Sequence, residues 1–184
     1  MMSKILPGLS TTAWLVLAFV LSGALLAGAL FFEHVLGYHP CQMCYWQRDA
    51  HKAVMIVTAL GLAYRYFTKT DKYDRVLLLF AGVAFAVSFA IAFWHMGVEY
   101  KWWDGPKSCS APTGPSAINP NDIFDALNGK AKLPQCNEAP WHLLGISMAG
   151  YNALISGIAA LIGLRLAAKG TVDEQPSAQS RWSA

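Results

Sequence analysis

Residues 40–48 read Pro40-Cys41-Gln42-Met43-Cys44-Tyr45-Trp46-Gln47-Arg48, and they stand between two long apolar segments. The stretch places two thiols two residues apart, with an arginine one helical turn after the second thiol. A close thiol pair can gain or lose two electrons as a disulfide. We therefore expect the apolar segments on either side to hold this pair at the edge of a membrane.

Long uncharged runs identify the class of protein. The 184-residue chain is 55% hydrophobic and only 14% charged, which is apolar for a soluble domain. Residues 13–32 carry no charge, and residues 76–96 carry none apart from His95. Each run has about 20 residues, which is enough to cross a hydrocarbon core of about 30 Å. A signal peptide is the alternative for the first run, but the run is longer than the usual core of such a peptide and further spans follow it. The composition predicts an all-α, multi-pass membrane protein.

We expect one membrane domain over residues 1–184, built as a four-transmembrane-helix bundle. The helices are expected at about residues 13–32, 50–67, 76–97 and 141–166, with loops at about 33–49 and 98–140 and a disordered tail at about 170–184. In the long loop, residues 119–129 combine an N-cap, a proline at the first helical position and a final glycine. This pattern predicts a short amphipathic helix at the membrane surface.

The last span carries a stripe of small side chains. The stripe recurs every fourth residue and consists of Gly145, Ala149, Ala153 and Gly157. Such a stripe lets two helices approach closely in lipid. We expect generic helix packing along it.

Basic residues set the expected orientation. They cluster in the connection between the second and third spans, at Arg65, Lys69, Lys72 and Arg75. Under the positive-inside rule this connection is cytoplasmic. Both termini then lie on the same side, and both cysteine-bearing loops lie on the other. The net charge of +3 is spread over loops and tails, so we expect no nucleic-acid partner.

Three interpretations of the four cysteines compete. A structural zinc site usually needs two close cysteine pairs or added histidines, whereas here only one pair is close, although His34 and His39 lie near it. Two purely structural disulfides would fit the oxidising side of a membrane. A two-residue spacing, however, closes a small ring that adds little stability and favours redox use. We expect a redox relay and no metal.

Three ionisable residues accompany the thiol pair. If the second helix begins just after Pro40, Cys44 lies in its first turn, where the helix dipole stabilises a thiolate. Arg48, four residues on, can pair with that thiolate or with a reduced anionic ligand. The alternative is that Arg48 only extends its charge to the headgroups. His95 and Glu99 show the same four-residue spacing at the outer end of the third span, and ionisable groups within a membrane are functional candidates.

These residues resemble the disulfide bond formation protein B (DsbB) family of bacterial inner-membrane thiol oxidases. The similarity extends over about residues 13–166 and rests on four blocks in the same order. The blocks are residues 40–48, residues 94–99 (Trp-His-Met-Gly-Val-Glu), residues 103–110 (Trp-Asp-Gly-Pro-Lys-Ser-Cys-Ser) and residues 134–141 leading into 144–152.

The resemblance implies a four-helix bundle that binds a quinone, either ubiquinone or menaquinone, near the outer leaflet. It implies that a Cys109–Cys136 disulfide in the long loop oxidises a periplasmic thioredoxin-like carrier of the DsbA type. Cys41 and Cys44 then reoxidise the loop pair and pass two electrons to the quinone. The implied quinone contacts are Arg48, His95 and, with less support, Glu99.

We therefore expect a protein-dithiol:quinone oxidoreductase, monomeric in the bacterial inner membrane, with cytoplasmic termini and periplasmic cysteine loops. One alternative is a quinone reductase of the vitamin K epoxide type, which also uses a four-helix bundle and paired cysteines. Another is a metal-binding membrane protein without catalysis.

Overall fold

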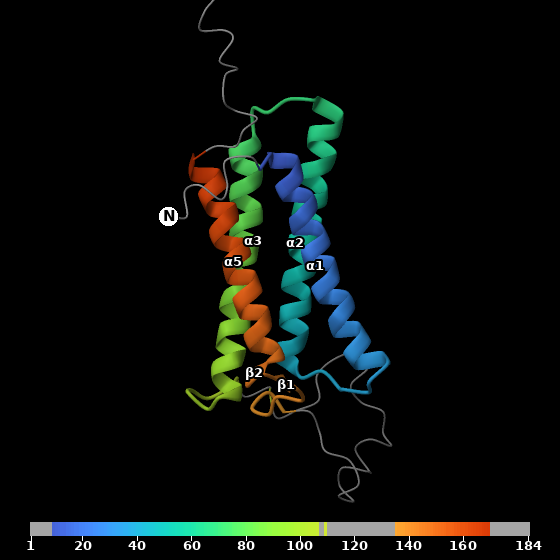
Figure 1. Cartoon of the computed structure of the whole chain (residues 1–184), viewed down its shortest axis with the longest axis vertical. Coiled ribbons are helices and arrows are strands. Elements are labelled where there is room, and N and C mark those ends of the chain that lie inside the picture. The colour runs from blue at the N-terminus through green and yellow to red at the C-terminus, as the bar shows by residue number, and fades with distance from the viewer. Residues whose placement is uncertain (1–8, 107–108, 110–134, 170–184) are drawn as a thin grey trace, which may run out of the picture.

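The computed structural model describes residues 9–106, 109 and 135–169, and within them it contains four long helices and one short β-hairpin (Figure 1). The helices are α1 (Thr11–His34), α2 (Gln42–Thr68), α3 (Asp74–Glu99) and α5 (Met148–Lys169). Strands β1 (His142–Leu143) and β2 (Ile146–Ser147) pair antiparallel just before α5. The expected all-α four-helix bundle is confirmed. The short helix expected at 119–129 and the tail expected at 170–184 lie outside the described residues.

Local signals set the helix starts, and two starts differ from those expected from hydropathy. α2 begins at Gln42, just after Pro40, and not at about residue 50, because Cys41 caps it and the polar residues that follow continue into the helix. α5 begins at Met148 and not at 141, because the hairpin occupies residues 142–147. Leu144 and Gly145 have φ of 51° and 79°, as a two-residue hairpin turn requires. Gly145 therefore lies in this turn, outside the small-residue stripe of α5.

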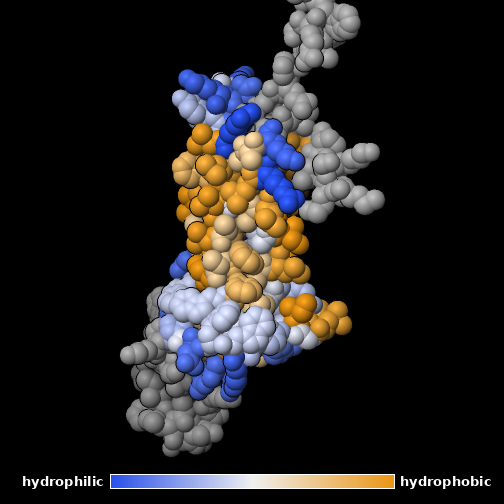
Figure 2. Space-filling view, turned by 90° about the vertical axis from the view of Figure 1, so that its left-hand side faces the viewer, coloured by the Kyte–Doolittle hydropathy of each residue, from blue (hydrophilic) through white to orange (hydrophobic). Residues whose placement is uncertain are grey.

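The surface of the bundle matches a membrane. α1, α3 and α5 are each long and apolar enough to span one. α2 has 27 residues and runs beside α1 and α3, although its sequence is more polar. Figure 2 shows an apolar band between two polar ends of the molecule. The chain is a membrane protein with a four-helix bundle.

Close packing of α3 against α5 holds one side of the bundle. A Cβ atom on Gly163 would lie 3.1 Å from the Cα atom of Gly82, and one on Gly82 would lie 2.9 Å from the backbone nitrogen of Leu164. Nearer the start of α5, a Cβ atom on Gly157, which belongs to the small-residue stripe, would lie 3.0 Å from the Phe89 ring. Small residues thus bring the two backbones together, as expected for helices in lipid. A core cluster draws residues from all four helices: Trp14, Ala18, Val54, Leu78, Phe85, Ala159, Ala160 and Leu166.

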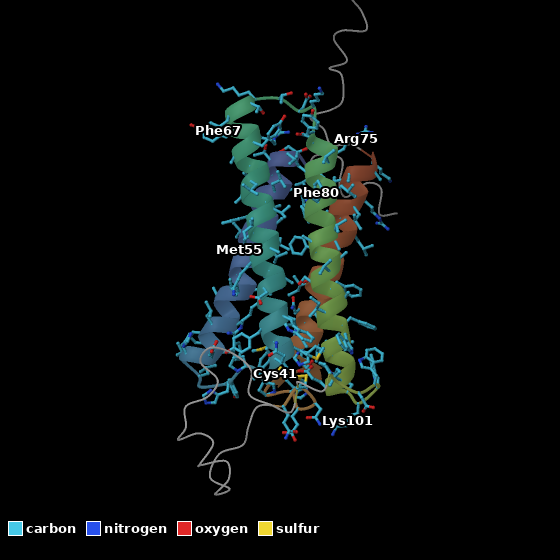
Figure 3. All side chains as sticks on the ribbon, turned by 180° about the vertical axis from the view of Figure 1, so that it is seen from behind. Cys41, Met55, Phe67, Arg75, Phe80 and Lys101 are labelled. Atoms are coloured by element: carbon cyan, nitrogen blue, oxygen red, sulfur yellow. A yellow bond between two sulfur atoms is a disulfide. The ribbon has the colours of Figure 1, made fainter. Side chains whose placement is uncertain are left out.

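The two ends of the bundle differ in chemistry. Cys41 and Lys101 lie at one end, whereas Phe67 and Arg75 lie at the other (Figure 3). α1 begins and α5 finishes at the same end of the bundle at which α2 connects to α3 (Figure 1). There, Arg65 pairs with the buried Asp74. The described cysteines are therefore all at the opposite end from the basic connection.

Candidate active site

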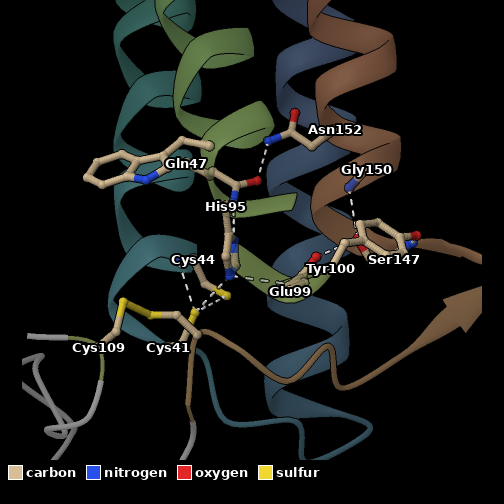
Figure 4. Close-up of polar contacts among 12 residues, drawn as sticks. Cys41, Cys44, Gln47, His95, Glu99, Tyr100, Cys109, Ser147, Gly150 and Asn152 are labelled. Carbon is tan, nitrogen blue, oxygen red and sulfur yellow. Dashed lines mark hydrogen bonds and ion pairs between the residues drawn. A yellow bond between two sulfur atoms is a disulfide. The ribbon is translucent and has the colours of Figure 1, made fainter. Parts of the chain in front are cut away.

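Two thiols and one disulfide meet at the cysteine end of the bundle (Figure 4). Cys41 and Cys44 are reduced, with their Sγ atoms 2.9 Å apart. Cys109 and Cys136 form a disulfide, which is the pairing that the family resemblance implied. The sulfur atoms of Cys41 and Cys136 and a ring nitrogen of His95 all lie within 4.8 Å of one another, and all three residues are buried. The two cysteine pairs are thus close enough for exchange after a small movement.

Cys41 is the thiol that this site stabilises as a thiolate. Its sulfur caps α2 by accepting from the Cys44 N–H at 3.4 Å, and it lies 3.5 Å from His95 Nε2. The hydrogen bond from the Cys44 thiol lowers the pKa of Cys41 most, burial raises it and His95 lowers it further, which gives a pKa of about 4. We had expected the helix N-terminus to stabilise Cys44. The structure assigns this effect to Cys41, because the capping sulfur faces the free N–H groups.

His95 and Glu99 stand beside Cys41 at the end of α3. His95 Nε2 lies 3.8 Å from Glu99 Oε1, so the expected contact across four residues is present. Glu99 also accepts a hydrogen bond from the Ser147 hydroxyl in β2. The other ring nitrogen of His95, Nδ1, lies 2.6 Å from Gln47 Nε2. A buried imidazole therefore connects the Cys41 sulfur, a carboxylate and an amide.

Arg48 binds α1 and not the thiols. It pairs with Glu33, and its Nη2 donates to the Ala29 carbonyl at 3.2 Å. Its side chain is only 11% exposed, which disagrees with a group that merely reaches the headgroups. Its Nε is buried and has no hydrogen-bond partner among the described residues. Within the described ranges, Arg48 thus keeps one buried donor unpaired while its terminal nitrogens bind α1.

A cavity of about 220 Å³ lies beside these groups, between α1, α2 and α5. Its α1 wall is apolar and consists of Ala24, Leu25, Leu26, Gly28, Ala29 and Phe32. Its polar lining includes Arg48, His95 and Glu99, the three residues that the resemblance implied as quinone contacts. A second cavity of about 220 Å³ is lined by Cys41, Cys44 and His95 together with Gln135 and Glu138. Cys44 and His95 line both cavities.

Cys41, His95 and Cys136 have the composition of a metal site. In this state, however, Cys136 is bonded to Cys109 and offers no thiolate. Only Cys41 and His95 of this cluster then remain as ligands, too few for structural zinc. The geometry favours redox use of the cysteines.

Comparison with known proteins decides the family. The family model described as "Disulfide bond formation protein DsbB" matches residues 10–166, most of the chain. The chain belongs to the DsbB family. Membership makes it a membrane oxidoreductase of disulfide formation, as the four sequence blocks predicted.

Individual DsbB relatives have similar sequence identities to this chain. Disulfide bond formation protein B of Pasteurella multocida is 31% identical over 158 residues, which cover 82% of each chain. The protein of the same name from Marinobacter nauticus is 29% identical over 159 residues, covering 84% of this chain and 90% of the relative. The one from Actinobacillus pleuropneumoniae is 30% identical over 156 residues, with 84% and 83% covered. No solved structure matches the chain.

The structure adds site residues to this DsbB-family chain that the sequence reasoning missed. Gln47 and His51 line the cavity from α2, and Asn152 lines it from α5. A signal existed for two of them, because Cys44, Gln47 and His51 are spaced by three and four residues and so share one helix face. Glu33 was assigned to a loop but belongs to the last turn of α1.

Proposed function

We propose that this chain is a membrane thiol oxidase that passes electrons from a periplasmic thioredoxin-like dithiol carrier of the DsbA type to ubiquinone or menaquinone. The observation that supports this most is the closeness of the Cys41 and Cys136 sulfur atoms, one from each cysteine pair. The cavity that Cys44 lines provides the second support, because it lies between membrane-spanning helices.

Disulfide exchange moves two electrons from the loop pair to the helix pair. Once a carrier dithiol has reduced the loop disulfide, the Cys136 thiolate attacks Cys41 of a Cys41–Cys44 disulfide. The Cys136–Cys41 bond forms, the Cys41–Cys44 bond breaks, and Cys44 leaves as a thiolate. Cys109 then attacks Cys136, which closes the loop disulfide and releases Cys41. Cys109 and Cys136 together give up two protons and two electrons, and Cys41 and Cys44 take up the same number.

The described state corresponds to the product of this exchange. The loop disulfide is closed, and Cys41 and Cys44 are reduced. Stabilisation of the Cys41 thiolate makes Cys41 a good leaving group when Cys109 attacks the mixed disulfide. The two sulfur atoms lie 2.9 Å apart, so reforming the Cys41–Cys44 bond needs little movement.

The residues of the first cavity fit a quinone head group. Its α1 wall suits an apolar ring and tail, and Arg48, which lines the same cavity, brings a cationic guanidinium to a carbonyl oxygen. A bound quinone would supply the two-electron acceptor that restores the Cys41–Cys44 disulfide. Glu33 and the Ala29 carbonyl hold the Arg48 guanidinium in place, and His95 stands 3.5 Å from the Cys41 sulfur.

We infer that the protein is a monomer in the bacterial inner membrane, with both termini in the cytoplasm and the cysteine loops in the periplasm. The separation of the cysteines from the basic α2–α3 connection supports this orientation.

Cysteine variants test the relay. In Cys109→Ser, Cys136 can attack Cys41 but nothing resolves the product, so a Cys41–Cys136 mixed disulfide should accumulate and steady-state carrier oxidation should stop. In Cys44→Ser, quinone reduction should stop, while the preformed Cys109–Cys136 disulfide still oxidises one equivalent of carrier. Peptide mapping reads the mixed disulfide, and quinone absorbance reads the electron acceptor. Normal steady-state carrier oxidation by Cys109→Ser or Cys136→Ser would show that the two-stage relay is wrong.

A further inference from the structure

We propose that Gln47 and Asn152 are positioning residues that hold the ring proton of His95 on Nε2, facing Cys41. The inference rests on the proposed role of Cys41 in disulfide exchange. It assigns a function to a buried hydrogen-bond chain that crosses the bundle from α3 through α2 to α5 (Figure 4).

The chain has three links between the helices. Gln47 Nε2 lies 2.6 Å from His95 Nδ1. The Asn152 Nδ2 donates to Gln47 Oε1 at 2.6 Å, and His51 Nε2 lies 2.8 Å from Asn152 Oδ1. Both amide groups thus have partners for their oxygen and their nitrogen, which a buried polar chain needs in order not to be destabilising.

The chemistry of these groups fixes the tautomer of His95. An amide nitrogen can only donate, so the short contact from Gln47 makes His95 Nδ1 an acceptor. A neutral imidazole whose Nδ1 accepts carries its proton on Nε2. That nitrogen lies 3.5 Å from the Cys41 sulfur and 3.8 Å from Glu99 Oε1. The proton therefore lies where a Cys41 thiolate can accept it as a hydrogen bond.

Asn152 keeps Gln47 from turning over. A rotated Gln47 amide would present its oxygen to His95 and move the ring proton to Nδ1. It would also set its own nitrogen against the Asn152 Nδ2, which leaves two donors face to face.

Asn152 is in turn held by its oxygen, which accepts from the Ser156 hydroxyl at 3.0 Å and from His51 Nε2. His51 Nδ1 has the Ser22 hydroxyl as its donor at 3.3 Å. All the donors thus point the same way, from Ser22 and His51 toward Cys41. Because Asn152 touches neither Cys41 nor His95 in this chain of contacts, its influence on the thiol has to pass through Gln47.

The test reads Cys41 directly, in protein depleted of quinone and with the loop disulfide intact. The Cys41 alkylation rate by iodoacetamide is followed between about pH 3 and pH 8, because only the thiolate reacts. Peptide mass spectrometry separates Cys41 from Cys44. As the solution is acidified, the alkylation rate of Cys41 falls when the thiolate becomes protonated. In Gln47→Leu and Asn152→Leu this fall should occur at a higher pH than in the wild type, because the thiolate loses a directed donor. On the acid side of the profile we expect a rate about tenfold lower, by analogy with the lower end of the effect of partners that orient a metal-ligating histidine.

A spectroscopic measurement reports the tautomer itself. The chain has five histidines, so 15N-histidine NMR is tractable, and a His95→Gln variant assigns the His95 signals. Wild-type protein should show an unprotonated Nδ1 and a protonated Nε2. Asn152→Leu should shift both signals toward a mixture of tautomers.

Ser156→Ala is the matched control, because it removes one hydrogen bond from the same Asn152 oxygen, and a contact with the Ser88 hydroxyl, but leaves His51 as a donor. It should keep the wild-type profile and tautomer. A proton on Nδ1 in the wild type would overturn the proposal, and so would unchanged profiles in Gln47→Leu and Asn152→Leu. An effect of Ser156→Ala as large as that of Asn152→Leu would also overturn it, because it would indicate a general loosening of the bundle. A negative result in the quinone or carrier assays would count against the proposed thiol oxidase but would not change the alkylation profile or the NMR spectrum. The positioning role of Gln47 and Asn152 is therefore tested separately from the proposed function.

Discussion

At the scale of single residues, Arg48 shows how the bundle orients a charge beside its cavity. Glu33 and the Ala29 carbonyl each take one terminal nitrogen of the guanidinium. Two bonds in one plane fix the direction of the third donor, Nε, which lies buried without a partner in the described part of the chain. Lysine offers only a point charge on a flexible stem, so it cannot reproduce this fixed plane.

We expect Arg48→Lys to impair quinone reduction and Arg48→Ala to impair it far more. Loss of a donor where negative charge develops typically costs about 3–4 kcal/mol, or roughly a hundredfold to a thousandfold in rate. Glu33→Gln should have a smaller effect, because the amide oxygen still accepts from Arg48. Steady-state quinone reduction is measured beside single-turnover carrier oxidation, which should survive in all three variants. Equal quinone rates for arginine and lysine would leave Arg48 only the structural role of pairing with Glu33.

Spacing and chemistry in the sequence pointed to most of the ionisable and sulfur-bearing groups of this candidate site, although not to His51. Cys41, Cys44 and His95 stand out because thiols and an ionisable ring are rare in an apolar chain. Gln47 and Asn152 do not stand out, since a neutral amide carries no charge signal and its role depends on contact between α2 and α5. The choice between Cys41 and Cys44 as thiolate depends on the exact cap of α2, which hydropathy does not determine.

At the scale of secondary-structure elements, the contact of α3 with α5 leaves no room for a side chain at its crossing point. Gly82 and Gly163 meet there, and the Gly82 position faces backbone as well as the Leu164 side chain. Backbone cannot move aside as a flexible side chain can. The crossing is therefore more sensitive to added volume than the rest of the helix surface.

Gly82→Ala should destabilise the protein by about 1–3 kcal/mol, the usual cost of overpacking, despite the higher helix propensity of alanine. Gly23→Ala is the matched control, because its new Cβ atom would meet only the flexible end of Met55 at 3.7 Å. We expect the control to be neutral or slightly stabilising. Thermal unfolding in detergent, followed by circular dichroism, measures both variants. A Gly82→Ala midpoint equal to that of Gly23→Ala would contradict the tight crossing.

Element boundaries were less predictable than the elements themselves. Hydropathy reports which residues contact lipid, and not where a helix begins. Residues 42–49 include Gln42, Gln47, Arg48 and Asp49 yet are helical, and residues 142–147 lie next to an apolar helix yet form a hairpin. Leu144 adopts a positive φ in the turn, a conformation that its residue type does not suggest.

At the scale of the whole molecule, Cys41 and the basic connection are at opposite ends of the bundle (Figure 3), and the other three cysteines cluster with Cys41. The two ends would then face two compartments separated by the apolar band in Figure 2. Charge counting along the sequence predicted this separation, since the positive-inside rule needs no tertiary structure.

In sealed, right-side-out vesicles, a membrane-impermeant thiol reagent should label the reduced cysteines without lysis. A Thr70→Cys substitution in the α2–α3 connection, made in a chain with the four native cysteines replaced by serine, is the control. It should react only after the vesicles are opened. The reverse pattern, with Thr70→Cys labelled in intact vesicles, would invert the proposed topology.

The shared lining of the two cavities has a consequence for insulation. Cys44 and His95 line both cavities together with Tyr38, His39 and Pro140, so one thiol and two imidazoles make up part of the partition between them. Under the proposed function, such a partition would keep small thiols in solution away from a bound quinone, while the Cys44 sulfur still carries electrons across it. Shortening the side chain of Cys44 or His95 would then let soluble thiols reduce the quinone directly.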